Sequence, residues 1–274
     1  MEKGTLYLCA TPIGNLEDIT LRALRVLRES DVVACEDTRR TGKLLAHFEI
    51  RKPMISYHKF NERARSAELL KRLGSGENIA LVSDAGMPGI SDPGFVVAAE
   101  AQAAGYSVTV VPGANAGLCA LLLSTFSCER FVFEGFLPEN KKERAERLAK
   151  LKQEQRTVIF YESPHNLSQT LQEMRGAFGN RRVCAVRELT KLYEESVVFS
   201  LEEYESFLQE HPPRGEYVLV LEGAQPEPDV FEGSAAEQVR LLMQQGMDKK
   251  SAVKEAARRR GVPKNEIYQQ VLEL

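Results

Sequence analysis

The chain has 274 residues, more than one average domain and fewer than three, which predicts two domains with a short appendage. Hydrophobic residues make up 43% and charged residues 27% of the chain, a composition that excludes disordered and low-complexity proteins. A formal net charge of -3 excludes a globally basic nucleic-acid-binding protein, so a local patch must meet any anionic partner.

The sequence lacks features of membrane insertion, secretion and metal binding. Its longest apolar runs, such as residues 118–123, fall far short of the ~20 residues that cross a bilayer, and its start lacks a signal-peptide layout. Five cysteines without C-x-x-C spacing predict reduced thiols in a cytoplasmic protein. Four isolated histidines lack ligand spacing, so no metal site is expected.

Short apolar segments alternate with helix-length amphipathic segments through the first part of the chain. Strands are predicted at residues 5–10, 32–35, 79–83 and 107–111. They lack the polar alternation of a half-exposed strand, which favours a mainly parallel sheet covered on both faces. We therefore expect an N-terminal α/β domain over residues 1–115.

A second α/β domain is expected over residues 116–224. The pattern predicts a charged helix at 141–152 and a helix that begins at Ser163 and Pro164, as cap and first-turn residues. Strands are predicted at residues 157–161, 182–186, 197–200 and 216–222. The simplest account of these elements is a mixed sheet.

Residues 225–274 are expected to form a linker and a helical tail. Two prolines mark residues 225–229 as the linker, and helices follow up to Gly246, over 249–260 and over 264–274. A short turn with a glycine between the last two helices resembles a helix-turn-helix. Residues 248–264 hold seven basic and two acidic side chains, a footprint for a phosphate backbone. Packing of the tail on the body or on a partner subunit is the equal alternative.

The segment from Ser83 to Gly94 is the best candidate for a ligand-binding loop. It holds three glycines and two prolines and follows a predicted buried strand, where open α/β sheets bind ligands. Residues 11–15 and 111–116 form similar turns after strands, so the three loops are expected to share one cleft. The chain contains neither a P-loop nor G-x-G-x-x-G, which disfavours nucleoside-triphosphate and dinucleotide enzymes. A plain connector is the alternative for residues 83–94.

Taken together, seven segments resemble the tetrapyrrole-methylase-like superfamily of S-adenosylmethionine-dependent methyltransferases. They are residues 10–15, 35–39, 83–94, 111–116, 160–165, 187–190 and 214–217. The resemblance implies the two-domain class III methyltransferase architecture, here with a helix-turn-helix-like tail. Within the superfamily, the chain resembles the enzymes that 2′-O-methylate a cytidine in the decoding region of 16S rRNA. A homodimer and a 16S rRNA or small-ribosomal-subunit partner are implied as well.

The resemblance also implies that S-adenosylmethionine lies between the two domains. Residues 83–85 stand where the superfamily has a glycine-aspartate-proline-type cofactor loop, and Asp84 could bind the ribose hydroxyls or the amino group. The residues that the resemblance assigns to the cofactor are Pro12, Gly14, Asp84, Ala85, Gly86, Met87, Ala114, Asn115, Tyr161, Pro164 and Glu216.

Methyl transfer to a ribose hydroxyl is an in-line displacement that requires no metal and that a nearby general base would help. The candidate bases are Glu36, Asp37, His58 and Glu188. Asp37 could instead cap a helix, and His58 could be a surface histidine. Phosphate contacts are expected from Arg39, Arg40, Lys59, Arg63 and Lys191, and from Lys249, Lys250, Arg258, Arg259 and Arg260 in the tail.

Two other functions compete with this interpretation. One is a tetrapyrrole methyltransferase, acting on a corrin precursor or uroporphyrinogen, and the basic tail argues against it because a small tetrapyrrole needs no phosphate-binding appendage. The other is a non-catalytic nucleic-acid-binding protein, against which the glycine-rich segment argues because a binding module needs no cofactor cleft.

Overall fold

The computed structural model describes residues 3–225, 231 and 233–271. The chain divides into two compact units, residues 1–223 and residues 224–274. No helix within the described residues is long and apolar enough to cross a membrane. All five cysteines are free thiols, and Cys128 is exposed. The division of the first unit at residues 115 and 116 stays a prediction.

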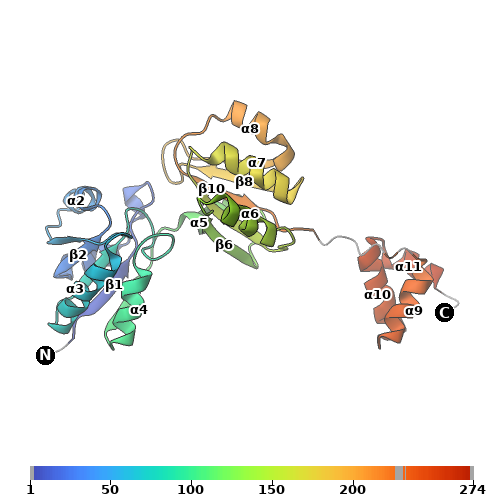
Figure 1. The fold of residues 1–274 in the computed structure, drawn as a ribbon, viewed down its shortest axis with the longest axis horizontal. Coiled ribbons are helices and arrows are strands. Elements are labelled where there is room, and N and C mark those ends of the chain that lie inside the picture. The colour runs from blue at the N-terminus through green and yellow to red at the C-terminus, as the bar shows by residue number, and fades with distance from the viewer. Residues whose placement is uncertain (1–2, 226–230, 232, 272–274) are drawn as a thin grey trace. The chain divides into compact units, whose positions relative to one another are not determined.

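The first unit begins with a five-stranded parallel sheet in the order β3-β2-β4-β1-β5 (Figure 1). Its strands are β1 (Thr5–Cys9), β2 (Val32–Cys35), β3 (Met54–Ser56), β4 (Ile79–Val82) and β5 (Ser107–Val111). Every residue of β2 and β4 is buried, as expected for central strands covered on both faces. The predicted parallel sheet is confirmed, and β3 is an additional edge strand.

Helices cover both faces of this sheet. Side chains of α3 (Glu62–Gly74) and α4 (Phe95–Ala103), such as Leu69 and Val97, pack with Leu6 and Leu81 in one cluster. Side chains of α1 (Leu21–Glu29) and α2 (Thr38–His47), such as Leu27 and Leu45, belong to a separate cluster. Because all five strands are parallel, the loops that follow them meet at one edge of the sheet. Two of these loops are joined directly, since the Thr11 N–H donates to the Gly86 carbonyl at 2.9 Å and the Gly86 N–H donates to the Thr11 carbonyl at 3.1 Å.

The second sheet of this unit is mixed, in the order β6-β7-β10-β8-β9, and confirms the prediction. Its strands are β6 (Phe131–Phe136), β7 (Thr157–Glu162), β8 (Arg182–Arg187), β9 (Glu195–Ser200) and β10 (Tyr217–Leu221). β6 runs parallel to β7, whereas β10 is antiparallel to β7 and β8. β6 was not predicted, because a bulge between Phe133 and Gly135 interrupts its alternation.

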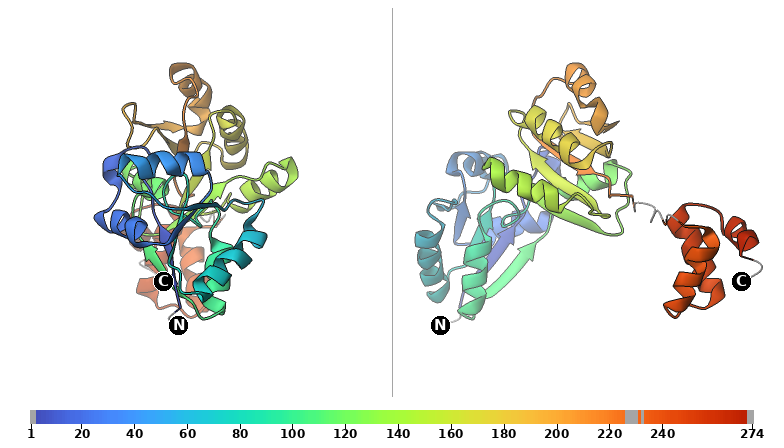
Figure 2. Two further views of the ribbon diagram at one scale, coloured as in Figure 1. Left: turned by 90° about the vertical axis from the view of Figure 1, so that its left-hand side faces the viewer. Right: turned by 45° about the vertical axis from the view of Figure 1, so that its right-hand side comes forward.

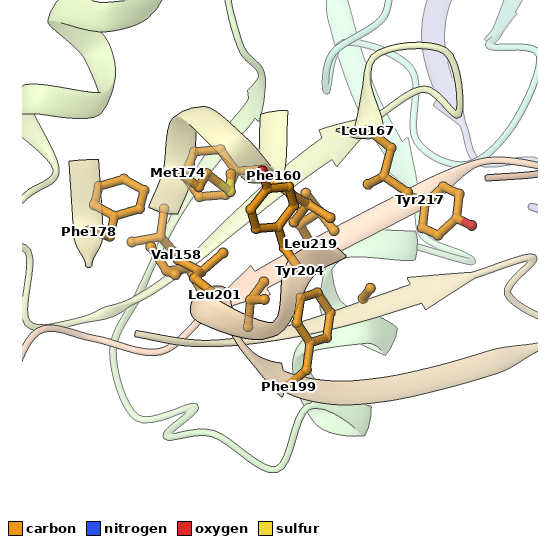
Figure 3. Packing of buried hydrophobic residues seen from close by; sticks show 14 of the residues in the cluster. Val158, Phe160, Leu167, Met174, Phe178, Phe199, Leu201, Tyr204, Tyr217 and Leu219 are labelled. Atoms are coloured by element: carbon orange, nitrogen blue, oxygen red, sulfur yellow. The ribbon is translucent and has the colours of Figure 1, made fainter. Parts of the chain in front are cut away.

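Helices α6 (Lys141–Lys150), α7 (Leu167–Phe178) and α8 (Tyr204–Glu210) complete this half together with α5 (Ala116–Leu123). Figure 3 shows the main core, in which Met174 of α7 packs near Phe160 and Leu219 of the sheet. Each such side chain contributes about 1.5–3 kcal/mol when it is fully buried. Leu121 of α5 packs with Ile159 in a separate cluster. The start predicted for α7 at Ser163 is wrong, because the helix begins at Leu167.

The second unit is helical over its described residues, as the orange and red ribbon of Figure 2 shows. It consists of α9 (Ala235–Gln244), α10 (Lys249–Arg260) and α11 (Lys264–Gln270), packed around Val239, Leu242 and Ile267. The Asp248 side chain accepts the Ser251 N–H at the start of α10, and Gly261 ends the helix in the left-handed conformation, with φ of 65°. The helices predicted at 249–260 and from 264 are confirmed. Residues 226–229 of the predicted linker and 272–274 of the last predicted helix lie outside the described residues.

Candidate active site

A cavity of about 390 Å³ opens where loops of the first sheet meet the second sheet, inside the first unit. We call it the central pocket. Loops after β1, β4 and β5 contribute Ile13, residues 85–87, residues 90–92 and residues 115–116. The rest of its wall comes from Phe136, Tyr161, Glu162, Ser163, Pro164, Val186, Glu188, Leu189, Lys191, Glu216, Tyr217 and Val218. Its size is that of small-molecule and cofactor sites.

The backbone of the loop over residues 83–94 is held firmly at the central pocket. Gly86 has φ of +78°, and a Cβ there would lie 3.3 Å from Ile13 Cγ2, so only glycine fits without strain. Ser83 Oγ donates to the carbonyls of Ala85 and Gly86, at 3.2 and 3.3 Å. At the far end, the Glu62 carboxylate accepts the Gly94 N–H at 3.2 Å. A loop fixed at both ends offers a preorganised backbone surface to a ligand.

Carboxylates and one lysine give the central pocket its charge. Burial raises the pKa of Asp92 to about 6, with further contributions from the negative charges of Glu36 and Asp84. Lys191 Nζ pairs with Glu188 at 2.9 Å and with Glu216 at 3.8 Å. Hydrogen bonding to Lys191 lowers the pKa of Glu188. A weakly acidic carboxyl and a cation therefore face the same cavity.

A buried polar network supports the end of β7 where it meets the central pocket. Arg144 of α6 is 6% exposed and Glu162 is 5% exposed, and they pair at 3.7 Å. Arg144 also bonds Thr170 and Glu173 of α7, and Thr170 donates to Glu162. The other Glu162 oxygen accepts the Ser163 N–H at 2.8 Å. The network thereby fixes the segment that carries Ser163 and Pro164 into the pocket wall.

The central pocket gathers seven of the residues assigned to the cofactor by resemblance, namely Ala85, Gly86, Met87, Asn115, Tyr161, Pro164 and Glu216. Pro12, Gly14, Asp84 and Ala114 do not line it. Gly14 packs against the neighbouring loop, because a Cβ there would lie 2.6 Å from Lys191 Cγ. Sequence reasoning missed Ser91 and Asp92, although both belong to the glycine-rich segment that it singled out.

Three of the four candidate bases lie in a second depression, lined by Glu36, Asp37, Thr38, Arg39, Ser56, His58, Phe60 and Asp84 and holding about 460 Å³. We call it the side groove. It shares one loop with the central pocket, since Asp84 lines the groove and the next three residues line the pocket. The fourth candidate, Glu188, lines the central pocket.

The carboxylates of the side groove differ in their surroundings. Asp37 accepts the Arg39 N–H at 2.8 Å and pairs with the Arg39 guanidinium at 2.7 Å, and these bonds hold its pKa far below the ordinary value. Its alternative role as the cap of α2 is confirmed. Burial and the nearby Asp84 raise the pKa of Glu36. Asp84 itself pairs with Arg40 at 3.2 Å and accepts the Asp37 N–H at 3.1 Å.

The basic side chains predicted to contact RNA fall into two groups, apart from Lys191, which lines the central pocket and pairs with Glu188 and Glu216. Lys59 and Arg63 are exposed near the side groove, as are Arg39 and Arg40. In the second unit, Lys250 is exposed and Lys249 is half-buried, whereas Arg258 and Arg259 pair with Glu255 at 2.6 and 2.8 Å. Arg260 donates to Gln238 at 2.5 Å and also to the Gly233 carbonyl. Arg260 therefore ties α10 to the start of its own domain.

Comparison with known proteins bears on both units. A family model described as Tetrapyrrole (Corrin/Porphyrin) Methylases matches residues 5–205, and one described as RsmI C-terminal HTH domain matches residues 232–274. A protein named ribosomal RNA small subunit methyltransferase I from Halalkalibacterium halodurans is 47% identical, with 97% of this chain and 94% of the relative covered. Its namesake from Synechocystis is 46% identical, with 99% and 98% covered.

Solved structures share the fold at low sequence identity. Uroporphyrin-III C-methyltransferase from Thermus thermophilus, complexed with S-adenyl homocysteine, is 21% identical with a TM-score of 0.56, covering 80% of this chain and 97% of that one. Diphthine synthase is 15% identical with a TM-score of 0.61, covering 80% and 90%. The chain belongs to the tetrapyrrole methylase family, and within it to the ribosomal RNA small subunit methyltransferase I proteins.

Proposed function

We propose that this protein is an S-adenosylmethionine-dependent methyltransferase that 2′-O-methylates a cytidine in the decoding region of 16S rRNA. The observation that carries the proposal is the 47% identity, over 97% of the chain, to a relative named for methylation of small-subunit rRNA. The central pocket supports it independently, because a cavity built by loops at the carboxyl edge of a parallel sheet suits a cofactor. The second unit supports an RNA substrate through its basic helix α10.

The residues of the central pocket fit S-adenosylmethionine. Gly86 has no side chain and a φ that disfavours one, so backbone groups of residues 85–87 can approach a ligand closely. Tyr161, Pro164 and Val218 offer apolar surface for a flat ring. Lys191 and Asp92 carry the opposite charges that a zwitterionic amino-acid group needs. When bound, the cofactor supplies a methyl group on a positively charged sulfur.

Glu36 is the best of the candidate bases in this chain. Its carboxylate lines the side groove, across the shared loop from the central pocket. It would take the proton of the acceptor hydroxyl as the new O–C bond forms and the methyl–sulfur bond of the cofactor breaks, leaving a neutral thioether. Its raised pKa makes it a stronger base than an exposed glutamate. Asp37 is held by Arg39 and Glu188 by Lys191, so both are better suited to positioning. His58 remains an alternative in the same groove.

The protein acts as a homodimer in the cytoplasm, where its ribosomal substrate is found. Apolar side chains of α5 and β6 support a dimer: Leu118, Leu122, Phe131 and Phe133 are all exposed. The two elements are neighbours, since a Cβ on Gly117 would lie 3.4 Å from Phe133 Cε2. Contiguous apolar surface of this kind usually meets a partner. Analytical ultracentrifugation tests this, with dimers expected for the wild type and monomers for Leu122→Glu.

The experiment that tests the activity maps ribose methylation in 16S rRNA from cells with and without the gene. One cytidine is expected to lose its 2′-O-methyl group, and the purified protein with S-adenosylmethionine should restore it on small subunits or on naked 16S rRNA. An unchanged methylation map contradicts the proposal. Methyl transfer to uroporphyrinogen instead of RNA would favour the tetrapyrrole alternative.

A further inference from the structure

A single aromatic ring stands out at the edge of the side groove. The Phe60 side chain is 95% exposed and lines the groove together with His58, whose ring centroid lies 6.1 Å away. Scattered apolar side chains are common on surfaces and mean little alone. Phe60 differs because hydrogen bonds hold the backbone of its turn and because charged side chains line the same groove.

The turn that carries Phe60 is tightly bonded. The Asn61 side chain accepts the His58 N–H at 2.8 Å and donates to the Ser56 carbonyl at 3.1 Å and to His58 Nε2 at 3.2 Å. The Asn61 N–H also donates to the His58 carbonyl at 2.9 Å. These bonds lock residues 56–61 between β3 and α3. The backbone that carries the ring is therefore ordered before RNA binds, which avoids the conformational cost of ordering a mobile loop.

Basic residues precede and follow Phe60 in the sequence. Lys59 precedes Phe60, Arg63 lies in the first turn of α3, and both are exposed. Neither has an ion-pair partner among the residues that the structure describes. Arg39 and Arg40 stand at the groove as well, paired with Asp37 and Asp84. An aromatic face beside unpaired cations is the combination that binds single-stranded nucleic acid by base stacking and phosphate contact.

The side groove also borders the loop that lines the central pocket. Asp84 lines the groove, and the residues immediately after it, Ala85 and Gly86, line the central pocket. A nucleoside held in the groove would thus have its sugar beside the loop that borders the cofactor pocket. If the base of the acceptor nucleoside leaves its strand to enter the groove, a ring that receives the base offsets the lost stacking.

We propose that the side groove is the binding site for the acceptor nucleoside, with its base stacked on Phe60 and the flanking phosphates bound by Lys59 and Arg63. The proposal deepens the proposed function and rests on it for the identity of the nucleic acid. An apolar protein segment suits this surface less well, since the ring is isolated among charged side chains.

Fluorescence provides a direct test, because the chain contains no tryptophan. Phe60→Trp places one reporter in the groove of the full-length protein. Its emission should be quenched by a 16S rRNA fragment that carries the acceptor cytidine, and not by the same fragment with an abasic acceptor site. Stacking on the indole should also keep RNA affinity near that of the wild type.

Variants that remove the aromatic face complete the test. Phe60→Ala and Phe60→Leu should weaken binding of the RNA fragment about 5- to 140-fold, the equivalent of about 1–3 kcal/mol per stacked base. Cofactor affinity, measured by calorimetry, should stay unchanged. Leu21→Ala removes an exposed apolar side chain from α1, away from the groove residues, and is the control that should keep wild-type RNA affinity. Wild-type affinity in both variants, or equal quenching by the abasic fragment, overturns the proposal. Failure of the proposed function gives a different result. In that case the wild-type protein leaves the RNA fragment unmethylated, regardless of whether the fluorescence of Phe60→Trp is quenched.

Discussion

Two carboxylic acids near the shared loop, Glu36 and Asp92, have raised pKa values, and the ionisation of Glu36 is expected to set the pH dependence of methyl transfer. Burial is the first cause for both, and the negative charge of Glu36 adds to the effect on Asp92. Glu36 acts as a base in its deprotonated form, so the single-turnover rate should rise with pH through a range above the ordinary glutamate pKa and then level off. The curve is measured with saturating cofactor and RNA.

Glu36→Gln should remove that pH dependence, because the amide cannot take the proton. The rate should fall about 10²- to 10⁴-fold, the usual contribution of a general base. RNA and cofactor affinities should change little. Asp37→Asn is the matched control, since Asp37 already binds Arg39. A wild-type rate in Glu36→Gln would exclude it as the base.

Asp92 lowers the free energy of unfolding at pH values at which its carboxyl group is ionised, and urea denaturation can measure this effect. Its folded-state pKa of about 6 exceeds the ordinary aspartate value of about 3.9, so the folded state loses stability as the pH rises from about 4 to 6 and stays less stable above. Asp92→Asn should therefore raise the free energy of unfolding at pH 8 by about 1–2 kcal/mol, after allowance for partial exposure.

Urea denaturation at pH 8 and pH 5 tests this, with a smaller gain at pH 5. Asp18→Asn, at an exposed carboxylate, should show no pH-dependent gain. Equal destabilisation by Asp92→Asn at both pH values would contradict the argument.

Single residues were the least predictable part of the site. The motif around residues 83–94 identified the loop, but a side chain's partners depend on the fold. Asp37 is only three positions from Arg40 in the sequence, yet the structure pairs Arg40 with Asp84, 44 residues away. Asp92 was missed because its burial arises where loop and second sheet meet, which no local pattern encodes.

At the scale of elements, the buried network between α6, α7 and β7 should matter more than a surface ion pair. Arg144→Ala leaves Glu162 buried without its guanidinium, a change that typically costs about 3–5 kcal/mol. Arg147→Ala, on the same helix, removes a pair with Glu134 in which Arg147 is half-exposed, and should cost about 0–1 kcal/mol. Urea denaturation compares the two variants.

Cofactor affinity provides a second measurement for the same network. Glu162 fixes Ser163 in the wall of the central pocket, so Arg144→Ala should also weaken cofactor binding, whereas Arg147→Ala should not. Adding Glu162→Gln to Arg144→Ala should recover part of the stability, because it removes the unpaired charge. Similar stability losses in the two single variants would argue against the network.

Elements with a complete local pattern were predictable. The buried strands β2 and β4 and the capped helix α10 followed from apolar runs, Asp248 and Gly261. β3 has three residues, too few for a pattern, and the bulge in β6 hides its alternation. Ser163 looked like a cap because it precedes a proline, but its N–H bonds Glu162 and the helix starts later.

At the scale of the whole molecule, the second unit should contribute to RNA affinity through charge alone. Lys249, Lys250, Lys254 and Lys264 lie on α10 and α11, and changing all four to Gln removes four positive charges from the full-length protein. Each lost phosphate contact lowers the salt-dependence slope by about 0.7 for single-stranded RNA, so the slope should fall by up to about 3. Filter binding across a salt series measures it.

Arg258→Gln is the matched control, since Arg258 is paired with Glu255 and should alter the slope less than a lysine does. An unchanged slope in the fourfold lysine variant would favour the alternative that the tail packs on protein. A flatter slope with an unchanged methylation site would separate the two units by role: charge in the second unit sets how tightly RNA is held, and the side groove in the first sets which nucleoside reacts.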